Sequence, residues 1–284
     1  MVAFTEKLLS LTIGGVSIPS GVRASVQIEL LTNSQGMANG IIYGLPLSTM
    51  NSMTILSGKT VNQPANTPIT IQAGDSSGMS LCFSGNLIQG FVDAHSMPEV
   101  GFRFNAVPGA NAAVTNIEPT STQGSGDVAT IAQKVAGQSS DLKFENNGIS
   151  KKLSNPYLSG SLLEQLKKLM SDSNTSWTID NGIFAAFDIS KGRQGSGNVT
   201  LSKSTGMIGY PAVSSPQIIV DCYYNPAIHV GSIVTIESEI TPANGNWLVM
   251  KLEAFLESLT PHGQWAMQLT LNVAGTDQAP GNQG

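Results

Sequence analysis

The sequence predicts a mainly β protein in which two small antiparallel, barrel-like β domains flank a smaller α/β module of two helices and a hairpin. Two long parts of the chain alternate apolar and polar residues with a period of two, which indicates strands with one buried face. Between them the apolar period lengthens to that of amphipathic helices. We therefore expect a first β domain over 1–108, the α/β module over 109–198, a second β domain over 199–275 and a flexible tail over 276–284.

In the first part, the alternation is clearest just after residue 21. Five apolar residues face one way, with polar or charged residues between them: Val22, Ala24, Val26, Ile28 and Leu30. Further strands are expected over 67–73, 81–93 and 100–107, separated by turns rich in glycine, serine or proline. The segment 36–40 is expected to be a loop or a short helical turn, and 47–56 fits either a helix or a strand. About six strands at this spacing predict a small barrel or a sandwich.

The middle part carries helix signals at both of its expected helices. Asp127 has the position of an N-cap, and Gly137 follows as the residue that ends the helix. Ser161 and Glu164 have the spacing of a capping box at the start of a second helix. The second helix has a continuous apolar stripe, formed by Leu162, Leu163, Leu166, Leu169 and Met170. The Asn-Gly pair after Asp180 is the strongest hairpin signal in the chain.

The pattern of the last part predicts an antiparallel meander with one buried face. Its three alternating segments cover 233–240, 248–256 and 265–273, with turn residues at 244–245 and 261–263. In the second of these segments we expect Leu248, Met250 and Leu252 on the buried face, and Lys251 and Glu253 on the polar face.

Composition and charge limit the functions that the chain can have. Only 12% of the residues are charged and the net charge is −5. A groove that binds nucleic acid by neutralising phosphates needs a basic surface, so specific nucleic-acid binding is not expected. Sparse charge favours a subunit that buries surface in an assembly, because charge is depleted at interface cores. The alternative interpretation of this composition is a secreted β protein with few charges.

Neither cysteine chemistry nor a membrane signal stands out. Cys82 and Cys222 lie in apolar, strand-like contexts where free thiols pack as small hydrophobes, although a disulfide between them stays open. No uninterrupted apolar run is long enough to cross a bilayer, and the N-terminus lacks the basic region of a signal peptide. We therefore expect cytoplasmic synthesis and no membrane insertion.

Three short segments imitate catalytic or nucleotide-binding motifs but lack essential parts. The run Gly124-Ser125-Gly126-Asp127 lacks the rest of a dinucleotide fingerprint, and Gly58-Lys59-Thr60 lacks the upstream glycine of a P-loop. Ser140 and Lys143 have the spacing of a serine-lysine pair without its accompanying motifs. We expect no catalytic residue, no cofactor and no metal site.

Histidines, carboxylates and tryptophans are the other candidates for chemistry. Three histidines border predicted turns: His95, His229 and His262. We expect them to lie at the surface and not to form a site. Two carboxylate pairs share the polar faces of strands, whereas a glycosidase needs two carboxyls that converge across a cleft: Glu237 with Glu239, and Glu253 with Glu257. Trp247 and Trp265 follow turns at the starts of adjacent strands, where they could close a barrel end or stack on sugars.

Several uncommon pieces of the last part occur together in a definite order. They are Gly206-Met207-Ile208-Gly209-Tyr210-Pro211, Asn225-Pro226-Ala227-Ile228, Gly231-Ser232-Ile233-Val234, Gly245-Asn246-Trp247, and Thr260-Pro261-His262-Gly263-Gln264-Trp265. Together they resemble the C-terminal part of the baseplate hub proteins of contractile-tailed bacteriophages, which are related to the hub part of type VI secretion spikes. The resemblance covers the last third of the chain well, the middle moderately and the first hundred residues only in style.

The resemblance implies a structural, non-enzymatic subunit of a virion tail baseplate that is assembled in the host cytoplasm. Three copies would form a ring of pseudo-sixfold symmetry, because each copy supplies two similar β domains. The ring would join the tail tube to the central spike and leave a bore for genome passage. Its partners would be two further copies of the chain, the tail spike protein, a tail tube or tube-adaptor protein, and other baseplate proteins. The expected structural or interface residues are Gly209, Tyr210, Pro211, Asn225, Pro226, Gly231, Trp247 and Trp265.

Two rival functions stay open at this point. A receptor- or carbohydrate-binding β module of a virion or secreted protein would lose sugar affinity on replacement of Trp247 or Trp265. A subunit of a cell-wall hydrolase would lose turnover when one acidic residue is removed.

Overall fold

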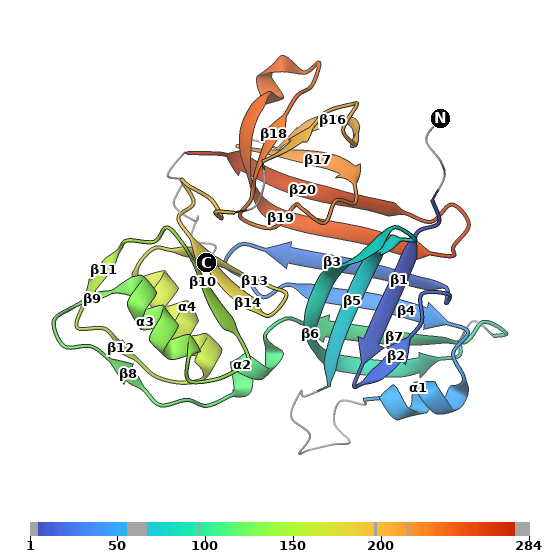
Figure 1. Ribbon diagram of the computed structural model, residues 1–284, viewed down its shortest axis with the longest axis horizontal. Coiled ribbons are helices and arrows are strands. Elements are labelled where there is room, and N and C mark those ends of the chain that lie inside the picture. Colours follow the sequence, from blue (N-terminus) through green and yellow to red (C-terminus); the bar gives the residue numbers. More distant parts are fainter. Residues whose placement is uncertain (1–4, 56–66, 96, 196–197, 215, 276–284) are drawn as a thin grey trace.

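The computed structural model describes residues 5–55, 67–95, 97–195, 198–214 and 216–275, so the expected tail and the Gly58-Lys59-Thr60 segment lie outside it. Strands dominate the described chain, and helices gather in its middle part (Figure 1). The expected class, mainly β with a smaller α/β module, is confirmed.

The described residues of the first part form seven strands and one short helix. These elements are β1 (Leu8–Ile13), β2 (Val16–Ile18), β3 (Ala24–Leu31), β4 (Met37–Tyr43), α1 (Leu47–Met53), β5 (Pro68–Asp75), β6 (Gly78–Asp93) and β7 (Gly101–Val107). The alternation expected in β3 is present, since Ala24, Val26, Ile28 and Leu30 are buried and the residues between them are not.

Strand β4 corrects the expectation of a loop or helical turn over 36–40. Asn39 and Gly40 are poor strand formers, but β4 pairs on both sides, with β3 and with β7. A Cβ atom on Gly40 would lie 2.4 Å from the ring of Phe104, so this glycine allows a close packing contact and does not mark a turn. Tertiary pairing thus outweighs the weak local preference of this segment.

The middle part forms a module of three helices beside three small sheets. Its elements are α2 (Ala110–Val114), β8 (Thr120–Ser121), β9 (Ser125–Asp127), α3 (Val128–Ala136), β10 (Lys143–Asn147), β11 (Lys152–Ser154), β12 (Tyr157–Leu158), α4 (Leu162–Asp172), β13 (Ser176–Asp180) and β14 (Ile183–Phe187). Asp127 caps α3, Ser161 and Glu164 form the expected capping box of α4, and Asn181-Gly182 connects β13 to β14. Strand β10, which pairs in parallel with β14, and helix α2 were not expected.

In the last part, the described residues form six strands and a short 3₁₀ turn. They are β15 (Val199–Leu201), β16 (Met207–Ser214), β17 (Gln217–Tyr223), β18 (Ile233–Ile236), the turn over Thr241–Ala243, β19 (Gly245–Ser258) and β20 (Trp265–Val273). The expected meander is present, with β18 shorter than its alternation suggested.

A bulge in β19 corrects the expected faces of this strand. The register with β20 shifts between Val249 and Lys251, which leaves Met250 as an extra residue. Because of this insertion Val249, rather than Leu248, shares the core face with Leu252. Leu248 is still buried, but on the opposite side of the strand.

One sheet runs through both β parts of the molecule. The path of hydrogen-bonded strands is β16-β17-β20-β19-β3-β4-β7-β6-β5-β1-β2, and β18 and β15 branch from β19. The two parts meet where β19 pairs with β3 over eight residues (Figure 1). No pairing among the described strands closes this path into a barrel.

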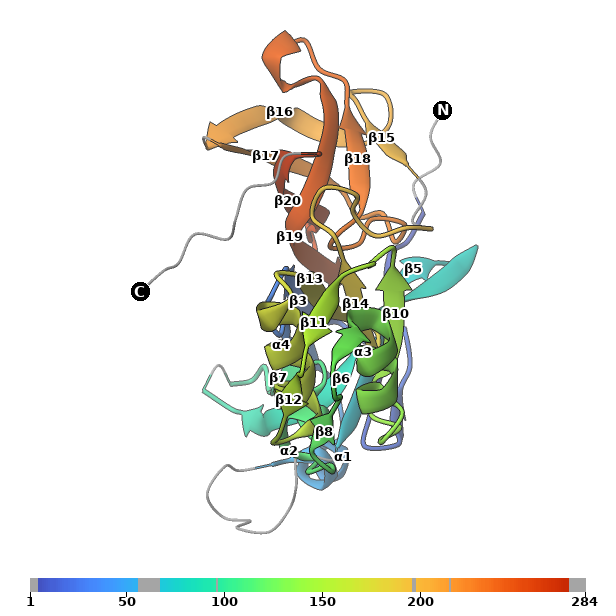
Figure 2. The same ribbon diagram turned by 90° about the vertical axis from the view of Figure 1, so that its left-hand side faces the viewer.

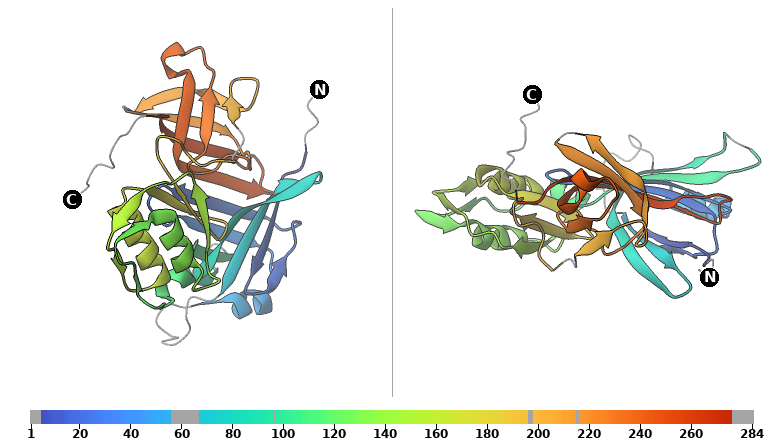
Figure 3. Two further views of the ribbon diagram at one scale, coloured as in Figure 1. Left: turned by 60° about the vertical axis from the view of Figure 1, so that its left-hand side comes forward. Right: turned by 90° about the horizontal axis from the view of Figure 1, so that it is seen from above.

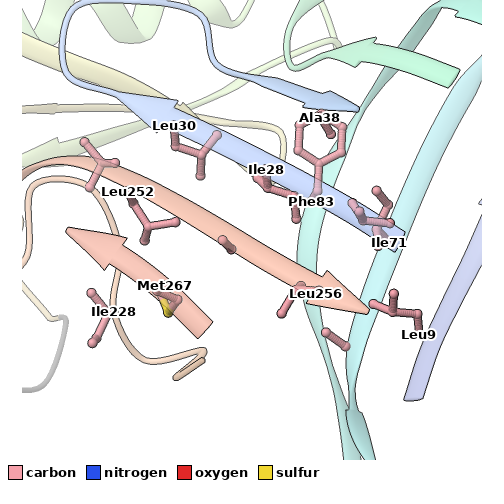
Figure 4. Packing of buried hydrophobic residues seen from close by; sticks show 14 of the residues in the cluster. Leu9, Ile28, Leu30, Ala38, Ile71, Phe83, Ile228, Leu252, Leu256 and Met267 are labelled. Carbon is pink, nitrogen blue, oxygen red and sulfur yellow. The ribbon is translucent and has the colours of Figure 1, made fainter. Parts of the chain in front are cut away.

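The hydrophobic core is shared across that seam. Leu30 of β3 and Leu252 of β19 lie close together there, with Ile28, Leu256 and Met267 nearby (Figure 4). A second core belongs to the module alone and is built mainly on the buried faces of α3 and α4. Seen from above, the module forms one end of the molecule (Figure 3), and Figure 2 shows the second β part above it.

Candidate functional site

Strand β16 is an exposed edge of the large sheet and carries most of the first motif singled out in the sequence, Gly206 to Pro211. Among the described strands it pairs only with β17, so its other side presents free backbone groups. Ile208, Tyr210 and Val213 of β16, and Tyr223 of β17, are exposed large hydrophobic residues. An unpaired edge beside exposed apolar side chains is typical of a protein contact surface. We call β16 with Tyr223 the β16 edge.

The Gly209-Tyr210-Pro211 sequence forms a bulge in the middle of this edge. The register with β17 shifts between Ile208 and Ala212, and Gly209 has a φ of +69° that favours glycine. Pro211 is buried and cannot donate a backbone hydrogen bond. The bulge therefore interrupts continuous strand addition at this edge.

Tyr210 points into an open groove between the β16 edge and the β18–β19 connection. Its hydroxyl donates a hydrogen bond to Glu239 Oε2 at 2.9 Å, and this bond together with the charge of Glu239 raises the pKa of the tyrosine. The groove has a volume of about 830 Å³. Its lining includes Lys203, Met207, Tyr210, Glu237, Glu239 and Asn244. Glu237 and Glu239 are thus exposed groove residues and do not converge with a second carboxylate pair across a cleft.

The Asn225-Pro226 pair fixes the turn that leads away from β17. Asn225 Oδ1 accepts a hydrogen bond from the backbone N–H of Ala227 at 3.0 Å, which is an Asx turn. The backbone N–H of Asn225 approaches the sulfur of Met267 at 3.2 Å, and Pro226 is exposed. Asn225 and Pro226 therefore fix the conformation of this loop.

Gly231 lies where the second β part meets the module. It has a φ of +86°, and an added Cβ would lie 2.8 Å from the ring of Phe187. Its carbonyl accepts a hydrogen bond from the backbone N–H of Arg193 at 2.6 Å, and its own N–H donates to the Val249 carbonyl at 2.8 Å. Gly231 therefore permits a close backbone contact that joins three segments.

An ion-pair network centred on the buried Asp180 reinforces the same junction. Arg193 Nη1 lies 2.8 Å from Asp180 Oδ2, and its Nε and Nη2 bind the two carboxylate oxygens of Glu145 at 2.7 and 3.2 Å. His229 Nδ1 lies 2.8 Å from the same Asp180 oxygen. Only 4% of the Asp180 side chain is exposed, so this carboxylate depends on its partners for solvation.

The network sets the charge state of its carboxylates. Burial alone would raise the pKa of Asp180, but the hydrogen bond from His229 and the positive charges of His229 and Arg193 outweigh burial and lower it. The hydrogen bond from Arg193 likewise lowers the pKa of Glu145. His229 therefore joins two parts of the molecule, where sequence reasoning placed it at a surface turn. Asp180 was recognised only as a turn residue, and no local signal pairs it with residues 13 and 49 positions away.

The two tryptophans act as packing residues. Trp247 is 8% exposed, and its ring N–H donates to the carbonyl of Ala243 at 2.8 Å. Trp265 is half-buried and meets the ring of Tyr224 edge-on at 5.9 Å between centroids. A sugar-stacking platform needs an exposed ring face, which Trp247 does not offer.

The other candidate residues are not assembled into a site. Within the described ranges, no group of three or more His, Cys, Asp or Glu side chains could hold a metal ion. Cys82 and Cys222 are free, and burial raises the pKa of each thiol to about 12. Asp127 Oδ1 accepts from the N–H of Thr130 at 2.8 Å, so the glycine-rich run before α3 has its helix N-terminus occupied by its own cap. In the same described part of the chain, no helix is long and apolar enough to span a bilayer.

Comparison with known families gives one match that covers most of the chain. The family described as baseplate hub gp41 matches residues 18–262. No curated protein sequence shows significant similarity to this chain.

Solved structures with the same fold come from tail and secretion proteins. A tail protein from Neisseria meningitidis MC58 has a TM-score of 0.65 at 8% identity, over 95% of this chain and 97% of that one. The E. coli c3393 protein has a TM-score of 0.61 at 11% identity, over 94% and 78% of the two chains. It is described as a component of the type VI secretion system with structural similarity to the T4 tail proteins gp27 and gp5. The 43 kDa tail protein of prophage MuSo2 from Shewanella oneidensis has a TM-score of 0.60 at 10% identity, over 93% and 97%.

Proposed function

We propose that this chain, which belongs to the baseplate hub gp41 family, is a structural subunit of a contractile tail. Three copies form a ring that joins the tail tube to the central spike and leaves a bore through which the genome passes. The observation that carries the proposal is the family match over residues 18–262, together with a single sheet that spans both β parts. The subunit belongs to the virion and assembles in the host cytoplasm.

The need for the ring follows from symmetry. A threefold spike has to join a sixfold tube, and a chain with two β parts gives six units in a trimer. The seam between β19 and β3 fixes the two β parts relative to each other within one copy. Such a subunit suits a mechanical role, because it transmits force through backbone hydrogen bonds and a shared core.

The proposed partners follow from the same role. They are two further copies of the chain, the tail spike protein, the tube or tube-adaptor protein and other baseplate proteins. Obligate contacts in such a ring bury on the order of 2,000 Å² or more. The role is mechanical and involves no catalysis, cofactor or metal.

The β16 edge is our proposed contact between copies. Its side chains are apolar and exposed, and Val213 is the most exposed of them at 73%. Proteins usually cover such a surface when they assemble. Gly209, Tyr210 and Pro211 shape this contact, whereas Asn225, Pro226, Gly231, Trp247 and Trp265 hold the loops and strands of the same β part in place.

A charge placed on the β16 edge tests this function. We expect Val213→Glu to abolish the oligomer in sedimentation velocity while the thermal midpoint changes little, because the side chain does not contribute to the core. The matched control is Val114→Glu on α2, which is 59% exposed and away from the edge. It should leave the oligomer intact. Equal oligomer formation by both variants would contradict the proposed contact.

A further inference from the structure

A small cavity lies where the two β parts and the module meet. Its volume is about 30 Å³, and its lining comes from β3, β6, the β13–β14 turn, the β17–β18 connection, β19 and β20. Ile28, Leu30, Leu252 and Met267 form an apolar side of it, at the seam between β3 and β19 (Figure 4). We call it the junction cavity. Whatever fills it contacts all three parts of the molecule.

The remaining lining of the junction cavity is largely polar. Asp180 and Asn181 contribute from the module, and Tyr224, Asn225 and His229 contribute from the second β part. Cavities lined only by apolar side chains stay dry, whereas polar cavities that are large enough hold ordered water. The character of the lining therefore favours a polar occupant.

Asn181 brings a buried acceptor to this junction. Its Oδ1 is inaccessible to solvent and accepts no hydrogen bond from any residue that the structure describes. Its φ of +51° is the conformation that the β13–β14 turn needs and that asparagine adopts readily, but the turn leaves the side-chain oxygen unsatisfied. Buried polar atoms in folded proteins almost always have a partner, which is often an ordered water.

Tyr224 brings a donor to the same cavity. Burial, followed by the effects of the neighbouring Cys82 thiol and of the charge of Asp180, raises the pKa of its hydroxyl, which therefore keeps its proton. The Cys82 thiol itself donates to the carbonyl of Ile71 at 3.2 Å. The sulfur beside the tyrosine is a weak acceptor, and a water oxygen is a better one.

Size and charge point to water as the occupant. A water molecule takes up about 30 Å³ in the liquid, which matches the junction cavity and leaves no room for a larger ligand. An anion would be repelled by Asp180. A cation would compete with Arg193 and His229, which each approach the Asp180 carboxylate to 2.8 Å.

We propose that the junction cavity holds one water molecule that accepts a hydrogen bond from the Tyr224 hydroxyl and donates one to Asn181 Oδ1. Its second hydrogen faces the carboxylate of Asp180. The water joins the second β part to the module and gives Asn181 a role besides that of a turn residue. The site lies within one copy of the chain, so the inference does not depend on the proposed ring.

A crystal structure of the full chain, at a resolution that shows ordered water, identifies the occupant. We expect one peak of density within roughly 3.2 Å of both Asn181 Oδ1 and the Tyr224 hydroxyl oxygen. A cavity without density, or one filled by a rearranged side chain, would overturn the inference. A peak that gains anomalous signal after a soak in rubidium chloride would reveal a cation and overturn it as well.

A double-mutant cycle tests the bridge in solution. Asn181→Gly removes the acceptor and suits the positive φ, and Tyr224→Phe removes the donor. Either change breaks the bridge, so the second change then costs less. We therefore expect the urea midpoint of the double variant to shift by less than the sum of the two single shifts.

The matched control is a cycle of Tyr224→Phe with Asn174→Gly. Asn174 also has a positive φ, of +47°, but its side chain is exposed. The shifts of this control cycle should add. Shifts that add equally well in the Asn181 cycle would overturn the bridge.

Discussion

Gly231 shows how one residue can decide whether two parts of the molecule join. Its positive φ and the 2.8 Å approach that a Cβ would make to the Phe187 ring leave no room for a side chain. We predict that Gly231→Ala lowers the free energy of unfolding by about 2–4 kcal/mol, from backbone strain and overpacking together. Urea denaturation measures this change. Gly21→Ala is the control, because no atom lies within 4 Å of its added Cβ, and it should change stability by less than about 0.5 kcal/mol.

Asp180 makes stability depend on pH. Its pKa in the folded protein lies below the ordinary value of 3.8, so the stabilisation is complete above that value and is lost as the pH falls through the folded pKa. We predict that Asp180→Asn costs about 2–4 kcal/mol at pH 7, because Arg193 loses one buried partner and keeps Glu145. Denaturation at pH 7 and below pH 3.8 checks this. The difference between wild type and variant should shrink at the lower pH, and a difference that is the same at both would contradict the account.

Individual residues were predictable from the sequence where their partners are close in the chain. The cap at Asp127 and the capping box of Ser161 with Glu164 bind backbone groups only three positions away, so their spacing alone reveals them. His229 and Asp180 are 49 positions apart, and each looked like an ordinary turn residue. No pattern of period two or 3.6 connects such a pair.

The same distinction holds for whole elements. Helix α4 and the β13–β14 hairpin carry strong local signals, and both are present as expected. Strand β4 was missed because its alternation is interrupted by Asn39 and Gly40, and its pairing partners supply the stability that its own residues lack. The bulge at Met250 escaped notice because both sides of β19 carry apolar residues there.

The α/β module should fold by itself. Its core of α3, α4 and β14 residues is separate from the core that the two β parts share. We therefore predict that a fragment over 109–198 gives dispersed amide signals in NMR and unfolds cooperatively. A fragment over 1–108 should not, because it would expose the apolar residues that β19 covers. Two well-folded fragments would contradict the shared core.

At the scale of the whole molecule, the sequence predicted the class but not the single sheet. Alternation reveals that strands exist and which side is buried, but the pairing of β19 with β3 joins segments more than 200 residues apart. Only the resemblance of the last third suggested two β domains that act together.

The measurement that tests the central claim most directly is the molar mass of the full chain by light scattering over a range of concentrations, followed by electron microscopy of the oligomer. The account predicts a mass of three chains and a six-lobed ring with a central hole. A monomer at every concentration, which remains a monomer when the tail spike protein is added, would contradict it.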